Sequence, residues 1–233
     1  MRRVPSTELL DDDRGTPTEI RQGLKDLWRI NRWLGGFSGT LQLLTRIFER
    51  AGIRQARILD VGAGDGRLAM RLGARLHRQG FRAEIFVLDR RLSHLEQGKM
   101  EGDTIHAIVG DALRMPFGEG AFHVVLCNLF LHHFSGEKLQ ALLSSLADAA
   151  SQAVVVNDLE RGWLPYLFIR ANPVFARSPL TRHDGPASVR QAYTRQELGE
   201  LVRAAGFRDF ELSKLPFCRL GLTIWKKASR KDS

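Results

Sequence analysis

Asp60 and the glycines at positions 62, 64 and 66 are the residues whose spacing says most about chemistry. They lie in the sequence ILDVGAGDG of residues 58–66. The apolar start of this run predicts a strand, and glycines at alternate positions let the backbone turn and approach a ligand closely. Such a turn favours a nucleoside cofactor. A dinucleotide fingerprint would require a third glycine where this chain has Arg67, so the motif argues against a pyrophosphate-containing cofactor.

The rest of the chain supplies the elements that would position this motif. From residue 56 onward, short β-rich runs alternate with helical patterns, which predicts an α/β fold with a doubly wound, mostly parallel sheet. Thr194 and Glu197 have the spacing of a capping box, and Gly206 ends the helix that they open. The predicted strands are 56–61, 83–88, 105–109, 123–128 and 153–157, and the predicted helices are 67–79, 92–100, 136–150 and 194–205.

Further motifs recur at the ends of the predicted strands. Asp89 ends the second strand, 23 residues after Gly66. Gly-Asp-Ala at 110–112 follows the third strand and opens a run that ends in Pro-Phe. Together with the glycine motif, this pattern resembles the class I S-adenosylmethionine-dependent methyltransferases. The resemblance covers residues 56–160 and implies a Rossmann-like, seven-stranded sheet whose last two strands, 208–215 and 219–227, form a closing hairpin.

The resemblance also implies a cofactor site for S-adenosyl-L-methionine. Asp89 would accept hydrogen bonds from both ribose hydroxyls, since a carboxylate is an efficient acceptor for two donors. Asp111 would meet the adenine amino group, and Ala112 would donate its backbone N–H to the ring. The end of the fourth strand would face the sulfonium. The residues expected to bind the cofactor are Asp60, Gly62, Ala63, Gly64, Gly66, Asp89, Arg90, Asp111, Ala112, Asn128 and Leu129.

The end of the fourth strand also narrows the class of acceptor. Methyltransferases that act on exocyclic or amide nitrogens carry two prolines here, whereas this chain has Asn-Leu-Phe-Leu at 128–131. The Leu-His-His-Phe that ends at Phe134 instead resembles the small-molecule branch, of the ubiquinone- and menaquinone-biosynthesis type. The sequence therefore predicts methyl transfer to oxygen or carbon of a small, partly apolar acceptor that is phenolic, quinone-like or polyketide-like.

Three histidines are candidates for a catalytic base. His132 and His133 could remove an acceptor proton, or could only hydrogen-bond nearby backbone. Because adjacent residues point in different directions, we expect at most one of them to face the pocket. Without a nearby carboxylate they lack the geometry of a metal ligand set, so no metal is predicted. His183, beside Asp184, is either a base and its partner or part of a polar turn, since Asp-Gly-Pro is a turn signal.

Two segments outside the core are expected to shape the pocket. Apolar spacing predicts two N-terminal helices, at 17–32 and 41–51, within a cap formed by residues 1–55 that packs on the methyltransferase domain of residues 56–233. These helices either cover the cofactor or only pack on the sheet. After the fifth strand, an apolar run at 163–169 predicts a helical insertion, and residues 160–193 would form an acceptor lid. Alternatively, the apolar residues of this insertion could contact a membrane surface or form an oligomer interface.

Length and composition limit the number of domains, the kinds of partner and the cellular location that the sequence allows. A chain of 233 residues suits one α/β domain with a cap. The formal charge of +9 comes from scattered arginines and a basic tail at 226–231, without the aromatic-interleaved stripe typical of nucleic-acid binding. No signal peptide or transmembrane run is evident, so a cytoplasmic protein is predicted, and Cys127 and Cys218 have no paired spacing. The oligomeric state is not predicted.

Three other functions stay open at this point. A nicotinamide-dependent oxidoreductase could use a similar fold, although Arg67 opposes it. An RNA or protein methyltransferase could use the same cofactor. A non-catalytic member of the fold could bind the cofactor without turnover, because a cofactor loop proves binding only.

Overall fold

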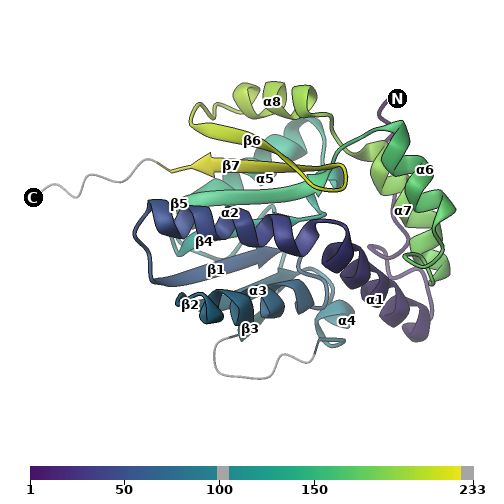
Figure 1. Cartoon of the computed structure of the whole chain (residues 1–233), viewed down its shortest axis with the longest axis horizontal. Helices are drawn as coiled ribbons and strands as arrows, with labels where there is room; N and C mark the ends of the chain where they lie inside the picture. The colour runs from purple at the N-terminus through teal and green to yellow at the C-terminus, as the bar shows by residue number, and fades with distance from the viewer. Residues whose placement is uncertain (99–104, 227–233) are drawn as a thin grey trace, which may run out of the picture.

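The computed structural model describes residues 1–98 and 105–226. Its centre is a seven-stranded sheet in the order β3-β2-β1-β4-β5-β7-β6 (Figure 1). The first five strands pair in parallel, and β7 runs antiparallel to both β5 and β6. The sheet is therefore mixed, with the predicted hairpin at one edge. The strands are β1 (Gln55–Val61), β2 (Arg82–Asp89), β3 (Ile105–Val109), β4 (Phe122–Asn128), β5 (Ala150–Leu159), β6 (Phe210–Leu215) and β7 (Arg219–Trp225).

Helices cover both faces of this sheet because alternate strand residues point to opposite sides. Ile58 of β1 packs with helices α2 and α3, whereas the next residue, Leu59, packs with α5 and α8. Both side chains are buried, as expected for a parallel sheet between two helical layers. The helices are α1 (Pro17–Trp33), α2 (Gly36–Arg50), α3 (Arg67–Arg78), α4 (Leu92–Leu95), α5 (Gly136–Ala149), α6 (Trp163–Ala171), α7 (Pro179–Gln191) and α8 (Arg195–Ala204), with the short 3-10 helix η1 (Leu131–His133).

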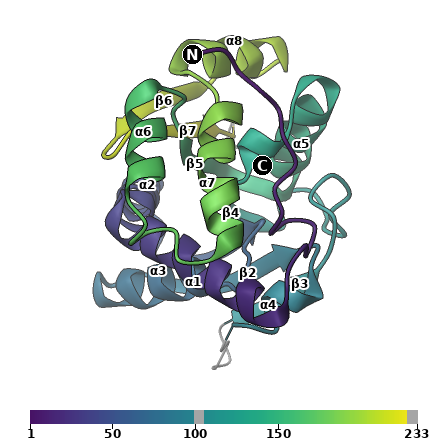
Figure 2. The same cartoon turned by 90° about the vertical axis from the view of Figure 1, so that its right-hand side faces the viewer.

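The helices α1, α6 and α7 stand together beyond the carboxyl ends of the parallel strands (Figure 2). Ile30 of α1, Ile169 of α6 and Val189 of α7 form one buried apolar cluster there. Gly35 separates α1 from α2 with φ +76°, and a Cβ at this position would lie 2.5 Å from the carbonyl oxygen of Pro216. A glycine is therefore required where α1 turns away from the sheet.

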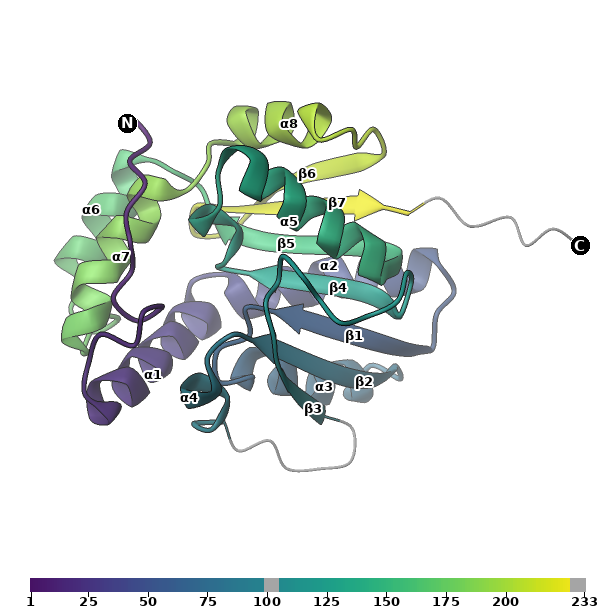
Figure 3. The same cartoon turned by 180° about the vertical axis from the view of Figure 1, so that it is seen from behind.

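The N-terminal segment, residues 1–16, contains no helix or strand, with turns at residues 9–13, and runs from the α7 side of the molecule down to α1 and α4 (Figure 3). Arg3 Nε donates to the carbonyl of Gln191, and the backbone N–H groups of Leu9 and Leu10 donate to the two oxygens of Asp184. At the far end, the guanidinium of Arg91 donates to the carbonyl of Asp11. The segment thus joins the insertion after β5 to the edge near β2.

Two sequence predictions need correction, and a third falls outside the described residues. Residues 92–100 do not form one helix, because α4 ends at Leu95 and residues 99–104 lie outside the described range. The Asp-Gly-Pro sequence at 184–186 is helical rather than a turn, with Pro186 inside α7. The helix forms because Ser178 caps its start and Leu180 and Val189 bury its apolar face. The basic tail from residue 227 onward also lies outside the described residues.

Within the described residues, no helix has the length and apolar character that crossing a bilayer requires.

Candidate active site

The glycine loop after β1 has the conformation that its sequence predicts. Gly62, Gly64 and Gly66 have φ values of +70°, +58° and +66°, a region that residues with a Cβ rarely adopt. Gly66 is the N-cap of α3. A Cβ on Gly62 would lie 2.5 Å from the ring of Phe130, so this glycine is required by the protein's own packing. A Cβ on Gly64 would meet only the side chain of Leu24, at 3.4 Å.

Asp89 at the end of β2 holds this loop in place. One carboxylate oxygen accepts the backbone N–H of Gly64 at 2.8 Å, and the other accepts that of Arg91 at 2.9 Å. A carboxylate has about four lone-pair sites, so two remain free for a ligand. Arg90 follows β2, and Asp111 and Ala112 follow β3. Together with Asp89 they line a large cavity that is described below. Four of the predicted cofactor residues therefore gather beside the glycine loop.

A small cleft lies where β1 and β4 end. It has a volume of about 70 Å³, and its lining includes Asp60, Ala63, Asp65, Arg67, Asn128 and Leu129. Burial, together with the charge of Asp89, raises the pKa of Asp60 to about 8. The buried Oδ1 of Asn128 has no hydrogen-bond partner among the described residues, and its amide donates to Asn31 Oδ1 at 2.9 Å. Leu129 has φ +50°, a strained conformation for a leucine.

A cavity of about 710 Å³ adjoins this cleft and extends beneath the N-terminal segment, α6 and α7. Its wall near β2 and β3 is polar. The opposite wall is apolar and is formed by Leu27 and Ile30 of α1, Phe168 and Ile169 of α6, and Val189 of α7. The cavity thus joins the predicted cofactor residues to an apolar space.

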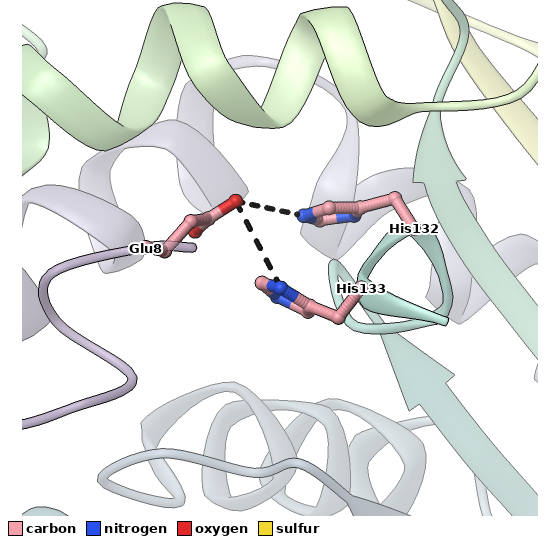
Figure 4. A group of neighbouring side chains, drawn as sticks. All are labelled: Glu8, His132 and His133. Carbon is pink, nitrogen blue, oxygen red and sulfur yellow. Dashed lines mark ion pairs between the residues drawn. The ribbon is translucent and has the colours of Figure 1, made fainter. Parts of the chain in front are cut away.

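His132 and His133 both line this cavity, contrary to the expectation that only one would. They lie in the tight 3-10 turn after β4, where their ring centroids are 4.3 Å apart. The N-terminal segment brings Glu8 against both rings, with Oε1 3.3 Å from His132 Nε2 and 3.9 Å from His133 Nδ1 (Figure 4). Asp11 Oδ2 lies 3.3 Å from the same nitrogen of His133.

His132 is a buried cation rather than a free base. Its Nδ1 lies 2.7 Å from Asp158 Oδ1, and its backbone N–H donates to Asp158 Oδ2. Burial alone would lower the pKa of His132, but the Asp158 carboxylate, together with Glu8, outweighs it and raises the pKa to about 10. Burial opposes ionisation of Asp158 and Glu8, yet the histidines reverse this effect and lower both carboxyl pKa values. At neutral pH, His132 therefore holds its proton between two carboxylates.

His183 lies apart from this group. Its side chain is 54% exposed on α7 and contacts Asp184 at 2.9 Å, and it does not line the cavity. Asp184 does line the cavity, but its oxygens bind the backbone of the N-terminal segment. The structure thus brings His132 and His133 together and leaves His183 outside.

Several polar residues of the site have no signal in the sequence. Glu8 and Asp11 precede the first periodic helix, and their partners follow more than 120 residues later. Arg219 is completely buried at the start of β7, where its guanidinium donates to Asn157 and Asn31 at 3.2 and 3.3 Å. Burial lowers the pKa of Arg219 to about 10. An Asn-Asp pair at the end of a strand could have indicated Asp158.

Comparison with known proteins decides the domain type. Residues 58–152 match a family described as methyltransferase domain. This part of the chain is therefore similar to that family. Together with the cofactor motif, the match identifies the protein as a methyltransferase that depends on S-adenosylmethionine. No protein of curated function matches the sequence.

Solved structures with the same fold extend the likeness to most of the methyltransferase. An S-adenosylmethionine-dependent methyltransferase from Aquifex aeolicus is 16% identical, with a TM-score of 0.64 over 91% of this chain and 98% of that one. A possible histamine N-methyltransferase from Thermotoga maritima is 15% identical, with a TM-score of 0.58 over 91% and 100%. Magnesium protoporphyrin IX methyltransferase from Synechocystis, with bound S-adenosylhomocysteine, is 17% identical, with a TM-score of 0.56 over 87% and 86%. At these identities the likeness concerns the fold.

Proposed function

We propose that this methyltransferase transfers its methyl group to an oxygen or carbon atom of a small, partly apolar acceptor that is phenolic, quinone-like or polyketide-like. The observation that carries the proposal is the cavity that joins the glycine loop to an apolar wall. Its volume of about 710 Å³ lies within the range of roughly 300 to 1,000 Å³ that is usual for small-ligand sites. The N-terminal segment, α6 and α7 line it, which favours a small molecule over a protein or RNA surface.

The residues at the sheet edge fit S-adenosylmethionine. The free lone pairs of Asp89 suit the two ribose hydroxyls, and Asp111 with Ala112 suits the adenine ring. Asp60 lies at the small cleft, where its carboxyl would meet the cationic amino-acid end. The unpartnered Oδ1 of Asn128 supplies an acceptor at the same end. When bound, the cofactor supplies an electrophilic methyl group on its sulfonium.

The far wall then defines the acceptor space. Side chains of α1, α6 and α7 offer an apolar surface, and His132, His133 and Glu8 form a polar group at its edge. A flat molecule with one or a few ionisable oxygens would match this pattern. Residues 1–55 act as a cap and residues 160–193 as a lid in this proposal.

The chemistry requires mainly positioning. An electron pair of the acceptor, a lone pair on oxygen or the π pair of an enol at carbon, forms the new bond to the methyl carbon. The S–C bond breaks, and its electron pair stays on sulfur to give S-adenosylhomocysteine. The acceptor's proton leaves to the polar group or to water. Holding the two atoms in line at about 3 to 3.5 Å and excluding water supplies much of the acceleration. His133 would bind the acceptor oxygen, and the positive charge of the neighbouring His132 would stabilise the charge on that oxygen.

Two tryptophan substitutions on α6 test the acceptor space. Ile169 is 9% exposed and lines the cavity, whereas Leu167 on the same helix is 57% exposed and does not line it. Ile169→Trp should fill the apolar end and lower turnover by at least about tenfold, since a misplaced acceptor can cost far more. Leu167→Trp is the matched control and should retain turnover.

The assay measures the release of S-adenosylhomocysteine. The acceptors tested are a panel of phenols, quinols and enolisable diketones, and RNA and protein extracts are tested in parallel. Affinity for S-adenosylmethionine, measured by titration, should stay unchanged in both variants. Methylation of RNA or protein, without turnover of any small acceptor, would contradict the proposal.

A further inference from the structure

Glu8, His132 and His133 place one carboxylate and two imidazole nitrogens within 4.8 Å of one another (Figure 4). The three side chains come from two distant parts of the chain, the N-terminal segment and the turn after β4. Their facing atoms are Glu8 Oε1, His132 Nε2 and His133 Nδ1. Two imidazoles and a carboxylate are a donor set typical of zinc, iron and other first-row transition metals.

The spacing of these atoms is close to that of a coordination shell. Ligands about 2.0 to 2.2 Å from a metal lie roughly 3 to 3.5 Å from one another. Glu8 Oε1 is 3.3 Å from His132 Nε2 and 3.9 Å from His133 Nδ1, so only small side-chain movements would be needed. Asp11 Oδ2 lies 3.3 Å from His133 Nδ1 and offers a further oxygen.

The surroundings of His132 also have the features of a metal-binding histidine. Metal-bound imidazoles usually donate their other ring N–H to a carboxylate, which fixes the tautomer and the ring orientation. His132 Nδ1 faces Asp158 at 2.7 Å, which directs Nε2 towards Glu8 and His133. His132 is only 2% exposed, and Nε2 has no well-formed hydrogen bond within the described residues. A metal ion would replace the proton that Nε2 carries in the metal-free protein, so its binding releases this proton and becomes tighter as pH rises.

The local charge favours a cation. Three carboxylates, those of Glu8, Asp11 and Asp158, surround the two rings. Ser188 and Gln191 of α7 donate to Glu8 and orient it. The guanidinium of Arg3 is occupied by backbone carbonyls, including that of His132, rather than by these carboxylates.

We propose that Glu8, His132 and His133 bind a divalent first-row transition-metal ion, with Asp11 as an additional ligand. The inference rests on the proposed function, because the same side chains line the acceptor cavity. An ion there would take the acceptor's hydroxyl as a further ligand and stabilise the oxygen anion. The acceptor class narrows to molecules that chelate, such as a phenol with a neighbouring hydroxyl or carbonyl, or an enolised diketone.

Titration of the untagged, chelator-treated protein with Zn²⁺ tests the site, and Co²⁺ absorption in the visible range reports its ligand geometry. We expect one ion per chain. Glu8→Gln and His133→Gln keep the size of each side chain and should each weaken binding at least about tenfold. Asp158→Asn should weaken it by roughly 10 to 100 fold, the usual effect of losing the partner of a metal-bound histidine.

His106→Gln is the matched control. His106 forms a similar histidine–carboxylate pair with Glu84, at 3.0 Å, on β2 and β3 away from the cavity. This variant should bind Zn²⁺ as tightly as the wild type. The affinity of every variant for S-adenosylmethionine should be unchanged, which shows that the fold and the cofactor site are intact.

The outcomes separate this inference from the function on which it rests. Failure of the wild type to bind Zn²⁺, or equal affinity in wild type and Glu8→Gln, would overturn the metal site. If such a protein still methylated small acceptors after chelator treatment, the proposed function would stand without it. If the wild type bound Zn²⁺ tightly and the Glu8→Gln and His133→Gln variants did not, the metal site would be supported even if no small acceptor were methylated.

Discussion

Binding of S-adenosylmethionine should release a proton from Asp60. The carboxyl is buried at the end of β1, and burial with the charge of Asp89 raises its pKa to about 8. At pH 7, roughly nine-tenths of cofactor-free molecules therefore carry a proton on Asp60. The cofactor would bring a sulfonium and an ammonium group to this end of the site, and a nearby positive charge favours the ionised carboxyl. We therefore expect close to one proton to leave for each cofactor bound.

Calorimetric titration in buffers with different ionisation enthalpies measures this proton directly. The slope of the observed enthalpy against the buffer enthalpy gives the number of protons released. The comparison is with Asp60→Asn, which has nearly the same shape and cannot ionise. The difference between the two slopes should be about 0.9 at pH 7 and about 0.1 at pH 9, where Asp60 is already ionised in the free protein.

Equal slopes for the two proteins at pH 7 would refute the reasoning. Asp60 would then be ionised before the cofactor arrives, or would lie outside the reach of its charge. A difference that persisted at pH 9 would assign the proton to another group.

The same raised pKa has a consequence for stability in the absence of cofactor. The folded state keeps a proton on Asp60 that the unfolded chain loses near its ordinary pKa of 3.8. Folding therefore becomes less favourable as pH rises from about 4 to about 8, by up to about 6 kcal/mol. Asp60→Asn should remove this dependence, so its advantage over the wild type in urea unfolding should grow from pH 5 to pH 8.

Two further predictions concern Asp89 and His132. Asp89→Ala should weaken S-adenosylmethionine binding by about 2 to 3 kcal/mol, because hydrogen bonds to a charged group are lost, and unchanged affinity in a folded variant would exclude the ribose role. His132→Gln should lower the free energy of unfolding by about 3 to 5 kcal/mol, because it leaves Asp158 buried without its counter-charge, and urea unfolding measures the loss. Since the folded-state pKa of His132 is raised, its stabilisation is complete below pH 6.5 and is lost as pH rises through about 10, so the variant and wild type should converge at high pH.

The sequence predicted the sheet well because its signals are local. The apolar runs around Ile58 and Val125 and the glycines after β1 need no distant partner to be recognised. Asp89 and Asp111 could be placed because the carboxyl ends of parallel strands meet at one edge. These residues do line the cavity that adjoins the glycine loop.

The acceptor side could not be predicted in the same way. Glu8 reaches its histidines only because the N-terminal segment crosses the molecule, and no periodicity reveals such a path. For Asp184 the sequence left open a polar turn or a partner for His183, but Leu180 and Val189 bury their side chains and make the segment a helix. The expectation for His132 and His133 failed because η1 is a tight turn in which neighbouring rings can lie side by side.

The path of the N-terminal segment has a consequence for how the molecule folds. This segment is synthesised well before its partners, because Leu9 and Leu10 bind Asp184, 175 and 174 residues further along the chain. Closing so long a loop is costly until the sheet already holds its ends together. We therefore expect the backbone amides of the N-terminal segment to gain protection from hydrogen exchange only after the sheet has formed. The wall that carries Glu8 would then assemble after the sheet, although its residues are synthesised before those of the sheet.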